Sequence, residues 1–105
     1  MCFKKKVKVA DKVREDRELI ETNSKLIQVV IELAKDNEEF VNKLKDLSDE
    51  LKYLRPSEKN EVKEYDEVIN KKIIDVKRSL MKADGNQDKL YTDIKVMIGY
   101  RNAVL

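Results

Sequence analysis

The chain has 105 residues, of which 42% are charged and 41% are hydrophobic, and its formal net charge is +2. It contains no histidine, one cysteine, two glycines and one proline. The length suits a single domain, and the small net charge singles out no class of partner. The absence of histidine removes the commonest general base, and the lone cysteine excludes an internal disulfide.

Residues 1–10 form a basic arm that we predict to be flexible. The arm carries +4 and the whole chain +2, so residues 11–105 carry −2. Clustered lysines attract a polyanion such as nucleic acid without reading its sequence. The alternative is a membrane-surface tether, in which Phe3 inserts, Cys2 is acylated and the lysines meet anionic lipid. The predicted polyanion contact consists of Lys4, Lys5, Lys6 and Lys8.

The stretch 19–54 carries the strongest pattern in the chain. Leucine or phenylalanine recurs at every seventh position, and a second row follows four residues behind. The first row is Leu19, Leu26, Leu33, Phe40, Leu47 and Leu54, and the second is Asn23, Val30, Asn37, Leu44 and Leu51. This spacing places both rows on one face of an α-helix. We therefore predict a helix that ends near residue 54 and begins near residue 24, or near residue 11 if the densely charged stretch 11–23 joins it.

Asn23 and Asn37 occupy the second row, fourteen residues apart. In a coiled coil, an amide buried at such a position fixes the register and the number of strands. Alternatively, each amide lies in water or marks a bend, because asparagine is a poor helix former and a good N-cap. The interaction seam, as we call this predicted surface, consists of Leu19, Asn23, Leu26, Val30, Leu33 and Asn37.

Two further helices follow. Pro56 predicts the first clear break, and Ser57 is the expected N-cap of a helix over residues 57–83. Gly85 is the expected left-handed residue in the next turn, before a helix over residues 87–104. Arg101 interrupts the apolar row of this last helix, and Gly99 lies inside it, either to admit another backbone or as a weak point.

These elements predict an all-α protein, an antiparallel three-helix bundle over residues 11–105. If the long first helix is bent or split near Asn23 or Asn37, the bundle has four helices. If that helix instead runs unbroken from residue 11, Leu19 and Ile20 extend past its partner, and uncovered apolar side chains of this kind favour self-association.

The sequence offers no chemistry for a reaction. Neither glycine belongs to a phosphate-binding loop, and the single cysteine has no histidine to activate it. A calcium loop starting at Asp84 fails where it would need glycine, at Lys89, and glutamate, at Lys95. We therefore expect no enzymatic activity, no catalytic residue, no cofactor, no metal and no small-molecule substrate.

The functional prediction is a small helical module for protein interaction or assembly. It would associate with itself or with a partner helix through the first helix, using the interaction seam. The alternative is a protein held on nucleic acid or on an anionic membrane by the lysine arm. A lone cysteine and the lack of a secretory signal after the lysines favour the cytoplasm.

Overall fold

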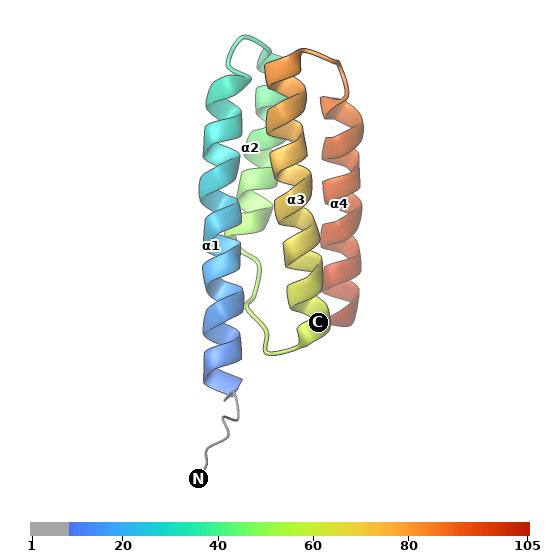
Figure 1. Cartoon of the computed structure of the whole chain (residues 1–105). Coiled ribbons are helices and arrows are strands. Elements are labelled where there is room, and N and C mark those ends of the chain that lie inside the picture. The colour runs from blue at the N-terminus through green and yellow to red at the C-terminus, as the bar shows by residue number, and fades with distance from the viewer. Residues whose placement is uncertain (1–8) are drawn as a thin grey trace.

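The computed structural model describes residues 9–105, and all regular secondary structure in that range is helical. Four helices follow one another: α1 (Val9–Leu33), α2 (Glu38–Lys52), α3 (Asn60–Lys82) and α4 (Gln87–Val104) (Figure 1). The predicted all-α class is confirmed for this part of the chain, and four helices are present. Within the same residues, no helix is long and apolar enough to cross a membrane.

The long first helix is split at one of the two positions that the sequence indicated. α1 ends at Leu33, and α2 begins after Asn37, whose side chain accepts a hydrogen bond from the backbone N–H of Phe40 at 3.1 Å. This is the N-cap arrangement, which satisfies an otherwise unpaired N–H of the first turn. Asn23 lies inside α1 and causes no break. A continuous helix over residues 24–54 is therefore not formed.

The apolar rows on both sides of this break still face one core. α2 folds back beside α1 (Figure 1), so the row before the turn and the row after it meet. The side chains at the centre of this core come from all four helices. They are Ile27, Val30, Ala34, Phe40, Leu44, Leu47, Leu51, Ile69, Ile73, Val76, Ile94 and Ile98.

The neighbours in the bundle are not simply consecutive in the chain. α1 packs on α2 and on α3, α4 packs on α3, and a smaller contact joins α4 to α2. The connection between α2 and α3, residues 53–59, crosses one end of the bundle, so α1 and α3 lie side by side and run in the same direction (Figure 1). A parallel pair therefore forms one face of a bundle whose consecutive helices run antiparallel.

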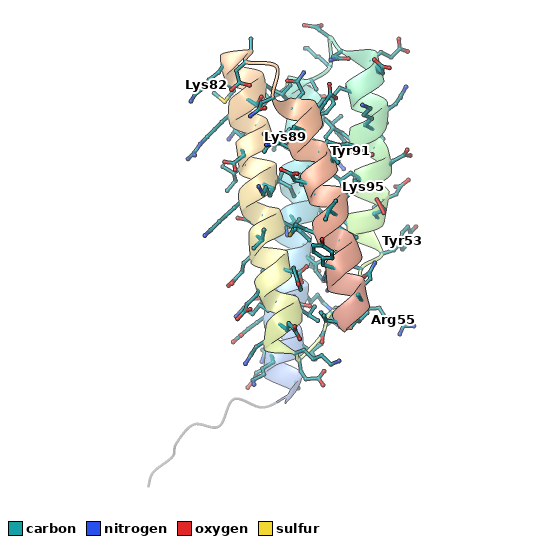
Figure 2. The ribbon with its side chains drawn as sticks, turned by 90° about the vertical axis from the view of Figure 1, so that its right-hand side faces the viewer. Tyr53, Arg55, Lys82, Lys89, Tyr91 and Lys95 are labelled. Atoms are coloured by element: carbon teal, nitrogen blue, oxygen red, sulfur yellow. The ribbon has the colours of Figure 1, made fainter. Side chains whose placement is uncertain are left out.

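The thin contact between α2 and α4 is made largely by side chains. Figure 2 shows Tyr91 and Lys95 on the side of α4 toward α2. The rings of Tyr91 and Phe40 meet edge to face with centroids 6.4 Å apart, and Lys95 forms an ion pair with Glu50. An edge-to-face pair contributes about 0.5–1.5 kcal/mol beyond its buried area, so this ring contact helps to fix α4 against α2.

Several expected helix boundaries need correction. α1 starts at Val9, within the predicted arm, and α3 starts at Asn60 rather than at Ser57. The Ser57 hydroxyl accepts from the Lys59 N–H at 3.0 Å, which forms a short turn before the helix instead of capping it. At the other end of α3 the left-handed C-cap is Ala83, with φ 54°, and Gly85 is a second left-handed residue, with φ 78°.

Two further expectations also change. Ile20 is only 5% exposed, so the apolar side chain predicted to lie uncovered at the start of the first helix is covered within the chain. A Cβ atom added at Gly99 would meet nothing within 4 Å, so this glycine does not serve a close approach of another backbone.

Candidate functional site

An apolar groove of about 520 Å³ runs along the outer side of the parallel pair α1 and α3. Its apolar walls are Leu26 and Val29 of α1 and Ile74 of α3. The complete lining is Thr22, Lys25, Leu26, Val29, Asn70, Ile74 and Lys77. Positions 22, 26 and 29, like positions 70, 74 and 77, are spaced to share one side of a helix. The helical period of each sequence therefore builds one wall.

Exposed apolar side chains continue both walls. Val29 is 46% exposed, and Leu33, seven residues after Leu26, is 45% exposed. Met81, seven residues after Ile74, is 68% exposed. Because residues seven apart lie on the same side of a helix, this apolar strip extends toward the ends of α1 and α3.

The charges in the groove are both positive, with Lys25 on one wall and Lys77 on the other. Glu18 and Glu32 lie seven residues before and after Lys25, on the same row of α1. Acidic side chains therefore flank Lys25 along α1.

The structure separates the residues of the predicted interaction seam. Val30 and Asn23 are buried, at 0% and 1% exposure, and Leu19 is half-buried. Leu26 and Leu33 belong to the groove and its extension, and Asn37 is exposed as the N-cap of α2. The six residues therefore do not form one continuous surface, although the groove retains part of their row.

Asn23 finds its hydrogen-bond partners inside the chain. Its amide donates to the backbone carbonyl of Asp66 at 3.2 Å, and its side-chain oxygen accepts from the amide of Asn70 at 2.8 Å. Both partners lie on α3. Asn23 therefore fixes the register of α1 against α3, the role predicted for it between two chains.

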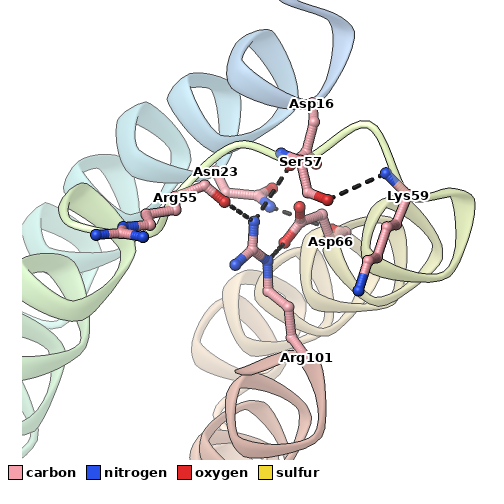
Figure 3. Close-up of polar contacts among 7 residues, drawn as sticks. All are labelled: Asp16, Asn23, Arg55, Ser57, Lys59, Asp66 and Arg101. Atoms are coloured by element: carbon pink, nitrogen blue, oxygen red, sulfur yellow. Dashed lines mark hydrogen bonds and ion pairs between the residues drawn. The ribbon is translucent and has the colours of Figure 1, made fainter. Parts of the chain in front are cut away.

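A buried ionic cluster lies at the end of the bundle where α4 finishes (Figure 3). It consists of Asp16 of α1, Asp66 of α3 and Arg101 of α4, and each of the three residues is 0% exposed. Arg101 Nε donates to Asp66 Oδ1 at 2.6 Å, and Arg101 Nη2 donates to Asp16 Oδ2 at 3.2 Å. One guanidinium thereby joins two helices that carry carboxylates.

The same cluster holds the connection between α2 and α3. Arg101 Nη2 also donates to the carbonyl of Arg55 at 2.8 Å, and the backbone N–H of Ser57 donates to Asp16 Oδ2 at 2.8 Å (Figure 3). Backbone polar groups that are buried in a loop require such partners. The cluster therefore positions residues 55–57 across the end of the bundle.

The ionic cluster is incompletely paired. Among the described residues, Asp16 Oδ1, Asp66 Oδ2 and Arg101 Nη1 are buried without a hydrogen-bond partner. The pKa of Asp66 is raised to about 7, first because burial removes water from its charged form and then because the Asp16 carboxyl group lies beside it, and Arg101 opposes the shift.

This cluster was not predicted from the sequence, although the sequence carries a signal for it. Asp16 precedes Ile20 by four residues, and Asp66 lies four after Val62, so each occupies a core position of its helix. Arg101 interrupts an apolar row in the same way. Two acids and one base at core positions of three helices indicate a buried ion pair, because unpaired charges are rarely buried.

The remaining predictions concern absences and the arm. Within residues 9–105, no group of three or more side chains could hold a metal ion. Lys4, Lys5, Lys6 and Lys8 lie outside the described residues, as do Cys2 and Phe3, so the polyanion and membrane contacts of the arm stay predictions.

Comparison of the chain with protein-family models, with curated proteins and with solved structures finds no match.

Proposed function

We propose that this chain is a non-enzymatic protein-interaction module that binds an amphipathic helix of another protein in the groove between α1 and α3. The observation that carries the proposal is the apolar lining of that groove, in which Val29 stays exposed and which the exposed Leu33 and Met81 continue. A helix docks in such a groove with apolar side chains at positions i, i+3 or i+4, and i+7.

The charges favour a partner protein over a second copy of this chain. Lys25 and Lys77 stand on opposite walls and would attract carboxylates on both edges of the partner's apolar strip. A second copy placed groove to groove would bring lysines toward lysines. In addition, the amide of Asn23 is occupied by α3 and cannot set a register between two copies.

A synthetic 18-residue amphipathic helix tests the proposal. Its apolar strip would carry leucines at positions i, i+3 or i+4, and i+7, and glutamates would flank the middle of this strip on both edges. A control peptide would carry lysines in place of these glutamates. Fluorescence anisotropy should show that the full chain binds the glutamate peptide more tightly than the control peptide. Lys25→Glu should reverse this preference, because Lys25 is an exposed side chain of the groove wall.

A matched pair of variants separates the groove from a general effect of added charge. Val29 in the groove and Val96 on α4 are 46% and 42% exposed, so neither change to glutamate removes a buried side chain. Val29→Glu should weaken binding about tenfold or more, since an apolar contact of this size contributes on the order of 1.5–3 kcal/mol. Val96→Glu should leave binding unchanged. Equal effects of the two variants, or binding of neither peptide, would refute the proposal. If the chain forms a dimer that Val29→Glu dissociates, the groove binds a second copy of the chain and not a partner helix.

A further inference from the structure

The ionic cluster holds two carboxylates against one guanidinium at 0% exposure, so its fully ionised form carries a net negative charge. Burying a net charge is costly, and proteins commonly avoid the cost by changing a protonation state. One proton added to the pair of carboxyl groups makes the cluster neutral.

The unpartnered atoms indicate where that proton belongs. Asp16 and Asp66 each use one oxygen to accept from Arg101, and the second oxygen of each is buried without a partner. Two ionised carboxylates cannot hydrogen-bond to each other, because neither has a proton to donate. A single proton gives one of the two neighbouring carboxyl groups a donor for the other.

We propose that Asp16 and Asp66 form a buried proton-binding site, in which the two carboxyl groups share one proton beside Arg101. The site binds the proton from solution at its two unpartnered oxygens, and no other bond forms or breaks. Loss of the shared proton leaves two negative charges facing one positive charge inside the bundle. This weakens the attachment of α1 and of residues 55–57 to α3 and α4.

The surroundings of the pair are consistent with a proton held near neutral pH. The pKa of Asp66 is raised to about 7 by burial and by the neighbouring Asp16 carboxyl group, against the opposing effect of Arg101. The other charged neighbours are Lys63 and Glu15, which pair with each other at 3.0 Å at the surface. The pKa of Lys63 is raised by Glu15 first, and more weakly by Asp16. The connection contributes the Arg55 carbonyl and the Ser57 N–H, and no charged side chain of α2 contacts the three residues.

The pH dependence follows from comparing the folded and unfolded chains. Unfolded aspartate releases its proton near pH 3.9. The folded pair keeps one until about pH 7, so between these values the folded state binds more protons. The contribution of the pair to the folding equilibrium constant is therefore largest at acid pH. It falls by up to about tenfold per pH unit between the unfolded and folded pKa values, and it is constant above the folded pKa.

The test is a titration of the aspartate Cγ chemical shifts in the full, ¹³C-labelled chain between pH 3.5 and 9. Asp16 and Asp66 should report a common step near neutral pH, because the titration belongs to the pair. The exposed Asp49, which lies outside the cluster, is the internal control. In Asp66→Asn, which preserves shape, the step near neutral pH should disappear from Asp16. If both members of the pair are ionised at pH 5, or if the step at Asp16 persists in the variant, the proposal is wrong.

A second measurement reports the consequence for the bundle. The Ser57 N–H donates to Asp16 and should show a lower hydrogen-exchange protection factor at pH 8 than at pH 5.5, after correction for the intrinsic exchange rate. In Asp66→Asn the two protection factors should be equal. A protection factor that does not change with pH in the wild-type chain would overturn the weakening that we propose.

Discussion

Replacing Arg101 by methionine removes the only positive charge of the ionic cluster and keeps a long apolar side chain at a position with 0% exposure. The variant loses the bonds of Nε to Asp66 and of Nη2 to Asp16, and the bond of Nη2 to the carbonyl of Arg55. The Asp66 carboxyl group and the Arg55 carbonyl then lack this donor, and the Asp16 carboxyl group keeps only the bond from the Ser57 N–H. Arg101→Met should therefore be among the most destabilising substitutions in the chain.

The magnitude follows from the cost of an unpaired buried charge. Removing one partner of a buried ion pair costs about 3–5 kcal/mol, and a domain of this size has on the order of 5–15 kcal/mol of stability. We expect a loss of about 3–5 kcal/mol at pH 8, and a smaller loss at pH 5, where the orphaned carboxyl groups can take up protons. Replacing all three residues, by leucine at 16 and 66 and methionine at 101, should recover part of the loss, because no buried charge remains although the Ser57 N–H and the Arg55 carbonyl lose their partners.

Urea unfolding followed by circular dichroism at 222 nm measures these differences. Arg78→Met, on the exposed side of α3, is the control and should change the free energy of unfolding by no more than about 0.5 kcal/mol. A decrease in the free energy of unfolding of less than about 1 kcal/mol for Arg101→Met at pH 8 would contradict the expectation. The reasoning is also refuted if the triple variant is as unstable as the single one, because the loss would then come from packing. If the single variant does not fold, the folded triple variant still decides between charge and packing.

Substitutions at four positions can be checked by the same urea titration. Asp66→Asn should remove a fall in stability of up to about 1.4 kcal/mol per pH unit between about pH 4 and pH 7, the window in which the folded state holds the extra proton. A slope that survives in the variant would show that another group holds the proton. Asn37→Ala should lose about 1 kcal/mol with the N-cap bond to Phe40, and Asn37→Asp should not. Gly99→Ala should gain up to about 1 kcal/mol, because helix propensity rises and the added Cβ meets nothing within 4 Å; a loss would show that the glycine has a packing role. Ala83→Gly should gain roughly 0.5–1 kcal/mol, because φ 54° strains alanine, and an unchanged midpoint would show that the strain is absent.

The sequence determined the helices and their buried faces, because both depend on residues close together in the chain. The sevenfold repeat identifies the buried side of α1 and α2, and the cap chemistry of Asn37 marks a position where the helix can divide. A hydrogen bond spanning three residues is sufficient for that cap. Such local signals cannot show that α2 turns back on α1. The sequence therefore did not decide between a continuous helix and a divided one.

Only the tertiary structure decided which helices are neighbours, and with that the nature of both candidate sites. Apolar periodicity states that a face is buried but not which element covers it, so the parallel pairing of α1 with α3 and the groove between them were not predictable. Asn23 illustrates the same limit, because its partners Asp66 and Asn70 lie 43 and 47 residues away. Asp16 and Arg101 lie 85 residues apart in the chain. Each charge would be too costly to bury alone, so both can occupy core positions only because folding pairs them.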